Sequence, residues 1–136
     1  MARIFIDTNI LVYTIDSYDK EKQRKSRKLL KEIAAEGNPV ISTQVLQEFY
    51  NAATMKLKTD KLIAKNMMHG FGSLDTVQVD LDIIEQAVDI SILSEISFWD
   101  SLIIAAAEAA NCSVLLSEDL ADGQVIRGIK ITNPFK

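Results

Sequence analysis

Acidic residues end or interrupt apolar stretches at Asp7, Glu48, Asp100 and Asp119. A carboxylate that lies against apolar side chains is costly unless it is paired or binds a cation. If these carboxylates converge, they cannot all remain ionised without a cation between them. Ligands that are all oxygen suit Mg²⁺ or Mn²⁺ rather than zinc. Such a metal lowers the pKa of a bound water and stabilises the transition state of phosphodiester cleavage.

Each of these acids also has a structural explanation. Asp7 could cap the next helical turn, and Glu48 could pair with an arginine or lysine across the core. Ser97 and Asp100 have the spacing of a capping box, and Asp119 could stabilise the first turn of a helix. The set as a whole favours the metal site, because most members lie beside apolar runs without a basic neighbour in sequence.

Other chemistries have few residues to support them. The single histidine, His69, lies in a polar, glycine-flanked stretch that is typical of a surface, so a ribonuclease with paired histidines is excluded. The sequence contains no phosphate-binding glycine motif and no serine in a nucleophile elbow. Near the acids, Thr8, Asn9 and Ser117 could orient metal ligands through their polar side chains.

Short apolar stretches that are typical of strands alternate with amphipathic or apolar helical stretches. We predict strands at 3–7, 39–42, 75–80, 113–117 and 129–135. We predict helices within 8–13, 19–38, 42–57, 60–72, 81–95 and 97–112. This alternation indicates a parallel sheet with helices on both faces. Active sites in such sheets lie beyond the carboxyl ends of the strands, where Asp7 and residues 117–119 would meet.

The composition is that of an ordinary globular protein. The chain has 136 residues, of which 48% are hydrophobic and 25% charged, so we predict one folded domain over 1–136. The net charge of −4 argues against a protein that coats nucleic acid electrostatically. It does not exclude an enzyme that acts on nucleic acid, because the sign of the potential is local.

The sequence predicts a cytoplasmic location. No apolar run approaches the ~20 residues of a membrane span, and Asp7 interrupts the only N-terminal stretch that could resemble a signal peptide. The single cysteine, Cys112, cannot form an internal disulfide and is expected to be a small core residue.

Four segments together resemble the PIN-domain family, and within it the VapC-type toxins of prokaryotic toxin–antitoxin pairs. These are "FIDTNIL", "STQVLQEFY", "SFWDSLIIAAA" and "LLSEDLADGQVIRGIKITNPF", which follow the family's order and spacing over nearly the whole chain. The resemblance implies a three-layer α/β/α sandwich with a short, mostly parallel central sheet. It also implies a Mg²⁺- or Mn²⁺-dependent endoribonuclease with an RNA substrate, a cognate antitoxin protein and a homodimeric toxin.

By position, Asp7, Glu48 and Asp100 match the family's core acidic ligands, and Asp119 matches a more variable fourth one. Asn9 and Ser117 match polar residues that line the site. The segment "SEDLAD" leaves open whether Glu118 or Asp122 assists Asp119. In the mechanism that the resemblance implies, metal-activated water attacks the phosphorus in line and leaves 5′-phosphate ends. The resemblance leaves open whether one metal ion or two are bound.

A basic stretch after Asp19 has two explanations. It is either a solvated helix face, or a surface that contacts RNA phosphates or an acidic partner segment. Its basic residues are Lys20, Lys22, Arg24, Lys25, Arg27, Lys28 and Lys31.

Other functions compete with the ribonuclease. A haloacid-dehalogenase-like phosphatase would need an acid where Asn9 stands, and a receiver domain would need paired acids before Asp7. An inactive PIN-like scaffold and a DNA-directed nuclease of the same chemistry remain as alternatives.

Overall fold

The computed structural model describes residues 2–136 and contains a six-stranded, mostly parallel sheet in the order β3-β2-β1-β4-β6-β5. The strands are β1 (Arg3–Ile6), β2 (Asn38–Ser42), β3 (Asp75–Val77), β4 (Val114–Leu116), β5 (Val125–Ile126) and β6 (Ile129–Thr132). The helices are α1 (Thr8–Tyr13), α2 (Lys20–Glu36), α3 (Thr43–Met55), α4 (Lys61–Phe71), α5 (Leu81–Ser94) and α6 (Phe98–Ala109). Helices cover both faces of this sheet, so the predicted α/β fold class is confirmed.

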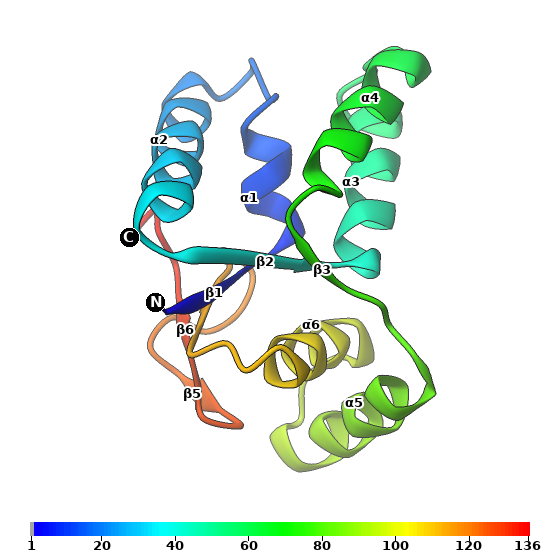
Figure 1. Ribbon diagram of the computed structural model, residues 1–136, viewed down its shortest axis with the longest axis vertical. Helices are drawn as coiled ribbons and strands as arrows, with labels where there is room; N and C mark the ends of the chain where they lie inside the picture. Colours follow the sequence, from blue (N-terminus) through cyan, green and yellow to red (C-terminus); the bar gives the residue numbers. More distant parts are fainter. Residues whose placement is uncertain (1) are drawn as a thin grey trace.

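The helices form two layers. In Figure 1, α1 to α4 lie on one side of the sheet and α5 and α6 on the other. Helix α3 packs against α1 and α4, whereas α6 packs against β2, β6 and α5. All residues from Ser101 to Ala107 are buried, as expected for a helix that lies between a sheet and a second helix. The side chains of Phe5, Ile41, Leu115 and Ile131 are fully buried on the strands.

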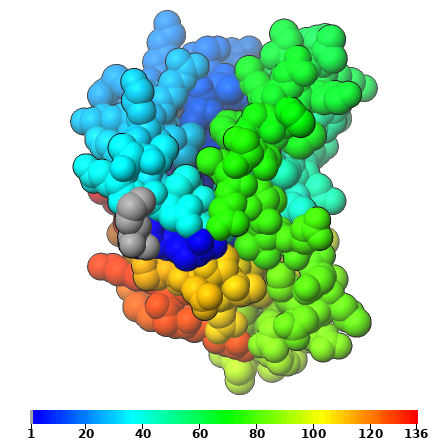
Figure 2. All heavy atoms as spheres, viewed as in Figure 1, coloured from blue at the N-terminus to red at the C-terminus, as the bar shows by residue number. Residues whose placement is uncertain are grey.

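The central strands end at one edge of the sheet. β1 pairs in parallel with β4, with Ile6 opposite Leu116, and with β2 on its other side. The residues that follow β1 and β4 therefore emerge side by side. At the opposite edge, the space-filling view shows the start of β1 (blue) enclosed by cyan, green and gold segments (Figure 2).

The local structure differs from the sequence predictions in three respects. The antiparallel pairing of β5 with β6 was missed, because β5 is only two residues long and carries no recognisable alternation. Residues 118–120 form bends rather than a helix, so Asp119 is not stabilised by a helix dipole. The strands predicted at 75–80 and 129–135 end earlier, at Val77 and Thr132.

Among residues 2–136, no single helix has the length and hydropathy of a membrane span, and α5 and α6 meet that criterion only as a pair bent by 118°.

Candidate active site

Asp7 lies at the junction of β1 and α1. Its backbone is extended, and its carboxylate accepts a hydrogen bond of 2.7 Å from the backbone N–H of Thr8. The hydroxyl of Ser117, directly after β4, donates to the other Asp7 oxygen at 2.7 Å. Asp7 and Ser117 are both buried. Asp7 therefore caps α1, which was the structural explanation considered for this residue, and it is also hydrogen-bonded to Ser117 at the end of the neighbouring strand β4.

Burial raises the pKa of Asp7 from 3.8 to about 6. The hydrogen bonds from Ser117 and Thr8 oppose this effect, while the negative charges of Glu48 and Asp119 add to it. The site thus holds a carboxylate whose ionised form is poorly stabilised by the protein alone. A cation beside Asp7 would favour that ionised form.

Glu48 reaches the same region from α3, which starts where the hydroxyl of Ser42 accepts the backbone N–H of Val45. The Thr8 hydroxyl donates to Glu48 Oε1 at 2.7 Å, and the Gln44 amide lies 3.4 Å from Oε2. Within residues 2–136, Glu48 forms no ion pair with arginine or lysine, so the proposed pairing across the core is wrong.

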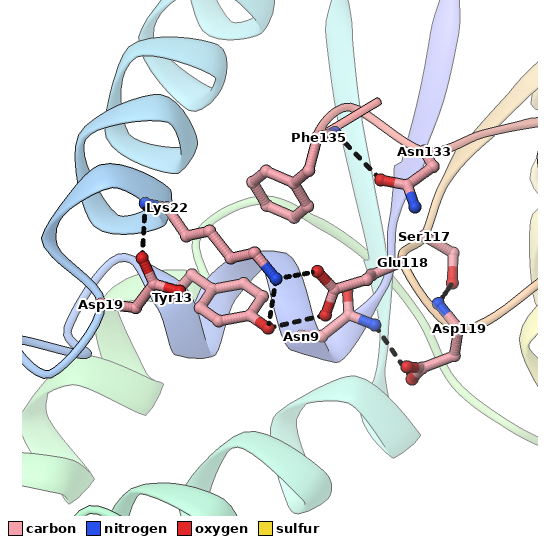
Figure 3. Close-up of polar contacts among 9 residues, drawn as sticks. All are labelled: Asn9, Tyr13, Asp19, Lys22, Ser117, Glu118, Asp119, Asn133 and Phe135. Atoms are coloured by element: carbon pink, nitrogen blue, oxygen red, sulfur yellow. Dashed lines mark hydrogen bonds and ion pairs between the residues drawn. The ribbon is translucent and has the colours of Figure 1, made fainter.

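Asp100 and Asp119 complete the acidic set. Asp100 lies in the first turn of α6, where Ser97 accepts its backbone N–H, and its side chain lines the site cavity. Asp119 follows β4 on a loop, and Asn9 Nδ2 donates to its Oδ2 at 2.9 Å. Its backbone N–H donates to the Ser117 hydroxyl at 3.2 Å (Figure 3).

One cavity of about 350 Å³ brings the four acids together at the carboxyl edge of the sheet. Its lining includes Asp7, Glu48, Asp100, Asp119, Thr8, Asn9, Tyr13, Gln44, Lys56, Trp99 and Glu118. Ser117 does not line it and acts from behind through Asp7. The sheet, α3 and α6 therefore converge on one acidic pocket.

The two further acids of the "SEDLAD" segment have other partners. Glu118 lines the cavity, but its oxygens accept hydrogen bonds from Lys22 Nζ at 2.5 Å and from the Tyr13 hydroxyl at 2.6 Å. Figure 3 shows these three side chains converging. Asp122 accepts the backbone N–H of Asn133 at 2.8 Å and does not line the cavity.

The donor set fits a hard divalent cation. Besides four carboxylates, the cavity lining includes two amide side chains whose oxygens, Asn9 Oδ1 and Gln44 Oε1, are buried without a hydrogen-bond partner among the described residues. Buried oxygens normally have a donor or a cation beside them. Within residues 2–136, no three His, Cys, Asp or Glu side chains already stand in a metal-binding arrangement. The carboxylates of Glu48, Asp119 and Asp7 instead accept hydrogen bonds from Thr8, Asn9 and Ser117, respectively.

His69, Cys112 and the basic residues of α2 lie outside the pocket. His69 is exposed on α4. Cys112 is buried, and burial raises the pKa of its thiol to about 11. The basic residues of α2 are mostly exposed and do not line the cavity, although Lys22 reaches its edge through Glu118.

Sequence reasoning missed Gln44 and Trp99. Gln44 stands one helical turn before Glu48, so the i, i+4 spacing could have placed it beside that acid. Trp99 precedes Asp100, and no periodic pattern predicts that an indole should remain exposed at the cavity.

Of the comparisons with known proteins, a scan of family models gives a family match. A family model described as PIN domain matches residues 4–121. No curated protein sequence matches the chain.

Solved structures with the same fold include complexes of toxins. A toxin–antitoxin complex from Klebsiella pneumoniae has a TM-score of 0.73 at 19% identity and covers 96% of this chain and 97% of that one. DNA-bound VapBC from Salmonella typhimurium has a TM-score of 0.71 at 20% identity, covering 98% and 99%. VapC20 of Mycobacterium tuberculosis, described as a sarcin–ricin loop cleaving toxin, has a TM-score of 0.66 at 17% identity, covering 82% and 86%. At such identities the likeness establishes the fold.

Proposed function

The chain belongs to the PIN domain family, and from that premise we propose that it is a Mg²⁺- or Mn²⁺-dependent endoribonuclease, the toxin of a toxin–antitoxin pair. The observation that carries the proposal is the convergence of Asp7, Glu48, Asp100 and Asp119 on one cavity. Two helices, the junction of β1 and α1, and the loop after β4 supply these acids, so their meeting depends on the fold rather than on local sequence.

In this proposal the four carboxylates hold the metal. When bound, the metal supplies an activated water and stabilises charge on the phosphate and the leaving 3′ oxygen. Asp7 contributes a buried charge, held in place by Ser117 and the start of α1. Thr8 orients Glu48, and Asn9 orients Asp119. Among the described residues that line the cavity there is no histidine, so the proposal assigns no proton transfer to a side-chain imidazole.

The test is cleavage of end-labelled structured RNA by the purified protein with Mg²⁺, with Mn²⁺ and with EDTA. A sarcin–ricin loop oligonucleotide belongs in the panel, because VapC20, which shares the fold, is described as cleaving that loop. We expect metal-dependent cutting that leaves 5′-phosphate ends and disappears in Asp7→Asn.

Asp122→Asn is the matched control. It makes the same change of carboxylate to amide, keeps an oxygen that can accept the Asn133 N–H, and lies outside the cavity. We expect it to cut RNA like the wild type. Equal cutting by Asp7→Asn and the wild type would overturn the site. Cutting of single-stranded DNA instead of RNA would make the chain a DNA-directed nuclease, and no cutting by a folded, metal-loaded protein would favour an inactive scaffold.

The partners belong to the same proposal. Similar folds occur in a toxin–antitoxin complex and in VapBC bound to DNA. We propose a small antitoxin as the partner of this chain, a homodimeric toxin and a cytoplasmic location. A short antitoxin-like reading frame beside the gene, and co-purification of its product, would support this pairing.

A further inference from the structure

Trp99 stands exposed at the edge of the acidic cavity. It is the only tryptophan of the chain, it lies in the first turn of α6, and 64% of its surface is accessible. It lines the cavity together with its neighbour Asp100. Single apolar side chains on a surface are common, but this ring stands at the edge of a cavity lined by carboxylates, where a ligand that enters the cavity would contact it.

The position of this residue is fixed from two sides. The Gln44 amide donates to the Trp99 carbonyl oxygen at 3.1 Å, which ties the start of α6 to α3. The Phe98 ring packs edge-on against the indole, with centroids 5.3 Å apart and planes at 72°. Edge-to-face contact of this kind favours a defined ring orientation. The exposed indole is therefore held in place before any ligand arrives.

Apart from the proposed metal, the cavity offers little positive charge to hold a phosphate. Among the described residues that line it, Lys56 is the one basic side chain. The acids that line it are Asp7, Glu48, Asp100, Glu118 and Asp119. A nucleic acid strand gains little from electrostatic attraction in such a pocket. Stacking of a base on an aromatic ring needs no positive charge and accepts any base.

We propose that Trp99 stacks on an unpaired nucleobase of the substrate strand next to the bond that is cut. This inference rests on the proposed nuclease function and assigns to Trp99 the contact with an unpaired base at this position. A base inside a duplex is already stacked on both faces and cannot lie flat on the indole. RNA-binding proteins therefore stack unpaired bases on their aromatic side chains.

Tryptophan fluorescence tests the contact directly, because Trp99 is the only reporter. A short single-stranded RNA of mixed sequence is titrated into the wild-type protein in EDTA, and gel analysis confirms that the RNA stays intact. We expect saturable quenching by the single strand and much weaker quenching by the same sequence annealed to its complement. Unchanged fluorescence under conditions in which a gel shift shows the RNA to be bound would overturn the proposal.

Kinetics of cleavage supply the second readout. Trp99→Ala is expected to raise KM roughly tenfold with a smaller change in kcat, and Trp99→Phe to recover part of the loss. Tyr18→Ala is the control, because Tyr18 is 86% exposed and lies outside the cavity. We expect its KM and kcat to match the wild type. A KM for Trp99→Ala equal to that of the wild type would contradict stacking.

The results separate this inference from the function on which it rests. Quenching by single-stranded RNA without cleavage under any metal would retain the stacking contact and overturn the nuclease. Cleavage without quenching would retain the nuclease and overturn the stacking contact. The competing occupant is a second copy of the chain, since Leu93 on α5 is also exposed. A concentration-dependent emission shift without RNA, together with a smaller assembly formed by Trp99→Ala, would assign Trp99 to that interface and overturn the stacking.

Discussion

The Ser117 hydroxyl donates a 2.7 Å hydrogen bond to Asp7 Oδ2 and so joins the residues that follow β4 and β1. The parallel register that places Ile6 opposite Leu116 makes this contact possible. Because both residues are buried, water cannot replace the hydroxyl without a rearrangement. This bond therefore keeps a carboxylate in an environment that otherwise disfavours its charge.

The free energy of unfolding of the metal-free protein should depend on pH through Asp7. Its pKa is about 6 in the folded protein and near 3.8 in an unfolded chain. Between those values the folded state keeps a proton that the unfolded state has released, so stability falls as pH rises from about 4 to about 6. The expected loss is at most about 3 kcal/mol and persists at higher pH.

Asp7→Asn isolates this effect, because the amide cannot ionise but can still accept the Thr8 N–H. Urea unfolding in EDTA should show the variant gaining on the wild type between pH 4 and 7. A difference that stays constant across this range would show that Asp7 does not titrate there. A variant that is less stable at every pH would instead show that the hydrogen bond from Ser117 to the carboxylate stabilises the fold by more than the buried charge costs.

Thr8 should control the metal affinity through Glu48. Thr8→Val removes the hydroxyl that donates to Glu48 Oε1 at 2.7 Å but keeps the branched side chain. Loss of a partner that orients a ligand typically costs about 10-fold or more in metal affinity. We expect weaker Mn²⁺ binding by calorimetry for Thr8→Val, and near wild-type binding for Thr8→Ser, which restores the hydroxyl. Equal affinities for all three proteins would contradict this role.

The sequence predicts the layered sheet well, because buried parallel strands are short apolar runs and the helices between them carry clear caps. Ser42 and Ser97 cap α3 and α6 as their positions suggest. β5 escaped prediction because it is held by antiparallel pairing with β6 rather than by a hydrophobic pattern of its own. Its Val125 is exposed and Ile126 buried, a pattern too short to recognise.

Some residues of the candidate site could likewise be placed from the sequence, and others could not. Asp7 could be placed from its position at the end of an apolar strand, since the end of a parallel strand is a fixed point in the fold. The separate partners of Glu118 and Asp122 could not be predicted, because they depend on long-range contacts with Lys22 and Asn133. Trp99 was missed for a different reason: exposure beside a cavity is a property of the folded surface.

Gln44 should link the two helices that carry Glu48 and Asp100. Its amide donates to the Trp99 carbonyl at 3.1 Å and lies 3.4 Å from Glu48 Oε2. Gln44→Leu leaves that carbonyl without its donor and should lower the free energy of unfolding by about 1–2 kcal/mol.

Gln44→Glu is a more stringent variant, because the glutamate side chain has nearly the same volume as glutamine. It replaces the donor with a second carboxylate beside Glu48, so it should be less stable than Gln44→Leu at pH 7, and the gap should narrow toward pH 4 as carboxylates gain protons. Urea unfolding at both pH values measures this. Wild-type stability of Gln44→Glu at pH 7 would show that the amide hydrogen bonds contribute nothing.

Lys22 should bind Glu118 and so prevent it from acting as a further ligand beside the proposed metal ligands. Its ammonium bonds Glu118 at 2.5 Å and lies over the rings of Tyr13 and Phe135, 4.9 and 5.3 Å from their centroids (Figure 3). Burial raises the pKa of Glu118, but the hydrogen bonds from Lys22 and Tyr13 outweigh it, so the pKa is lowered overall. Glu118→Gln should therefore leave Mn²⁺ affinity within about twofold of wild type, whereas removing the proposed ligand in Asp119→Asn should reduce it by about 10-fold or more.

A double-mutant cycle measures the ion pair itself. Because the side chains of Lys22 and Glu118 are 32% and 23% exposed, solvent screening limits the expected coupling in Lys22→Met and Glu118→Gln to about 1 kcal/mol. Since the folded-state pKa of Glu118 is lowered, this stabilisation is present above the ordinary glutamate pKa of 4.5 and is lost as pH falls below it. Urea unfolding of the four proteins should show the full coupling at pH 7 and a smaller coupling at pH 3.5. A large drop in Mn²⁺ affinity for Glu118→Gln, without any coupling to Lys22, would instead make Glu118 a metal ligand.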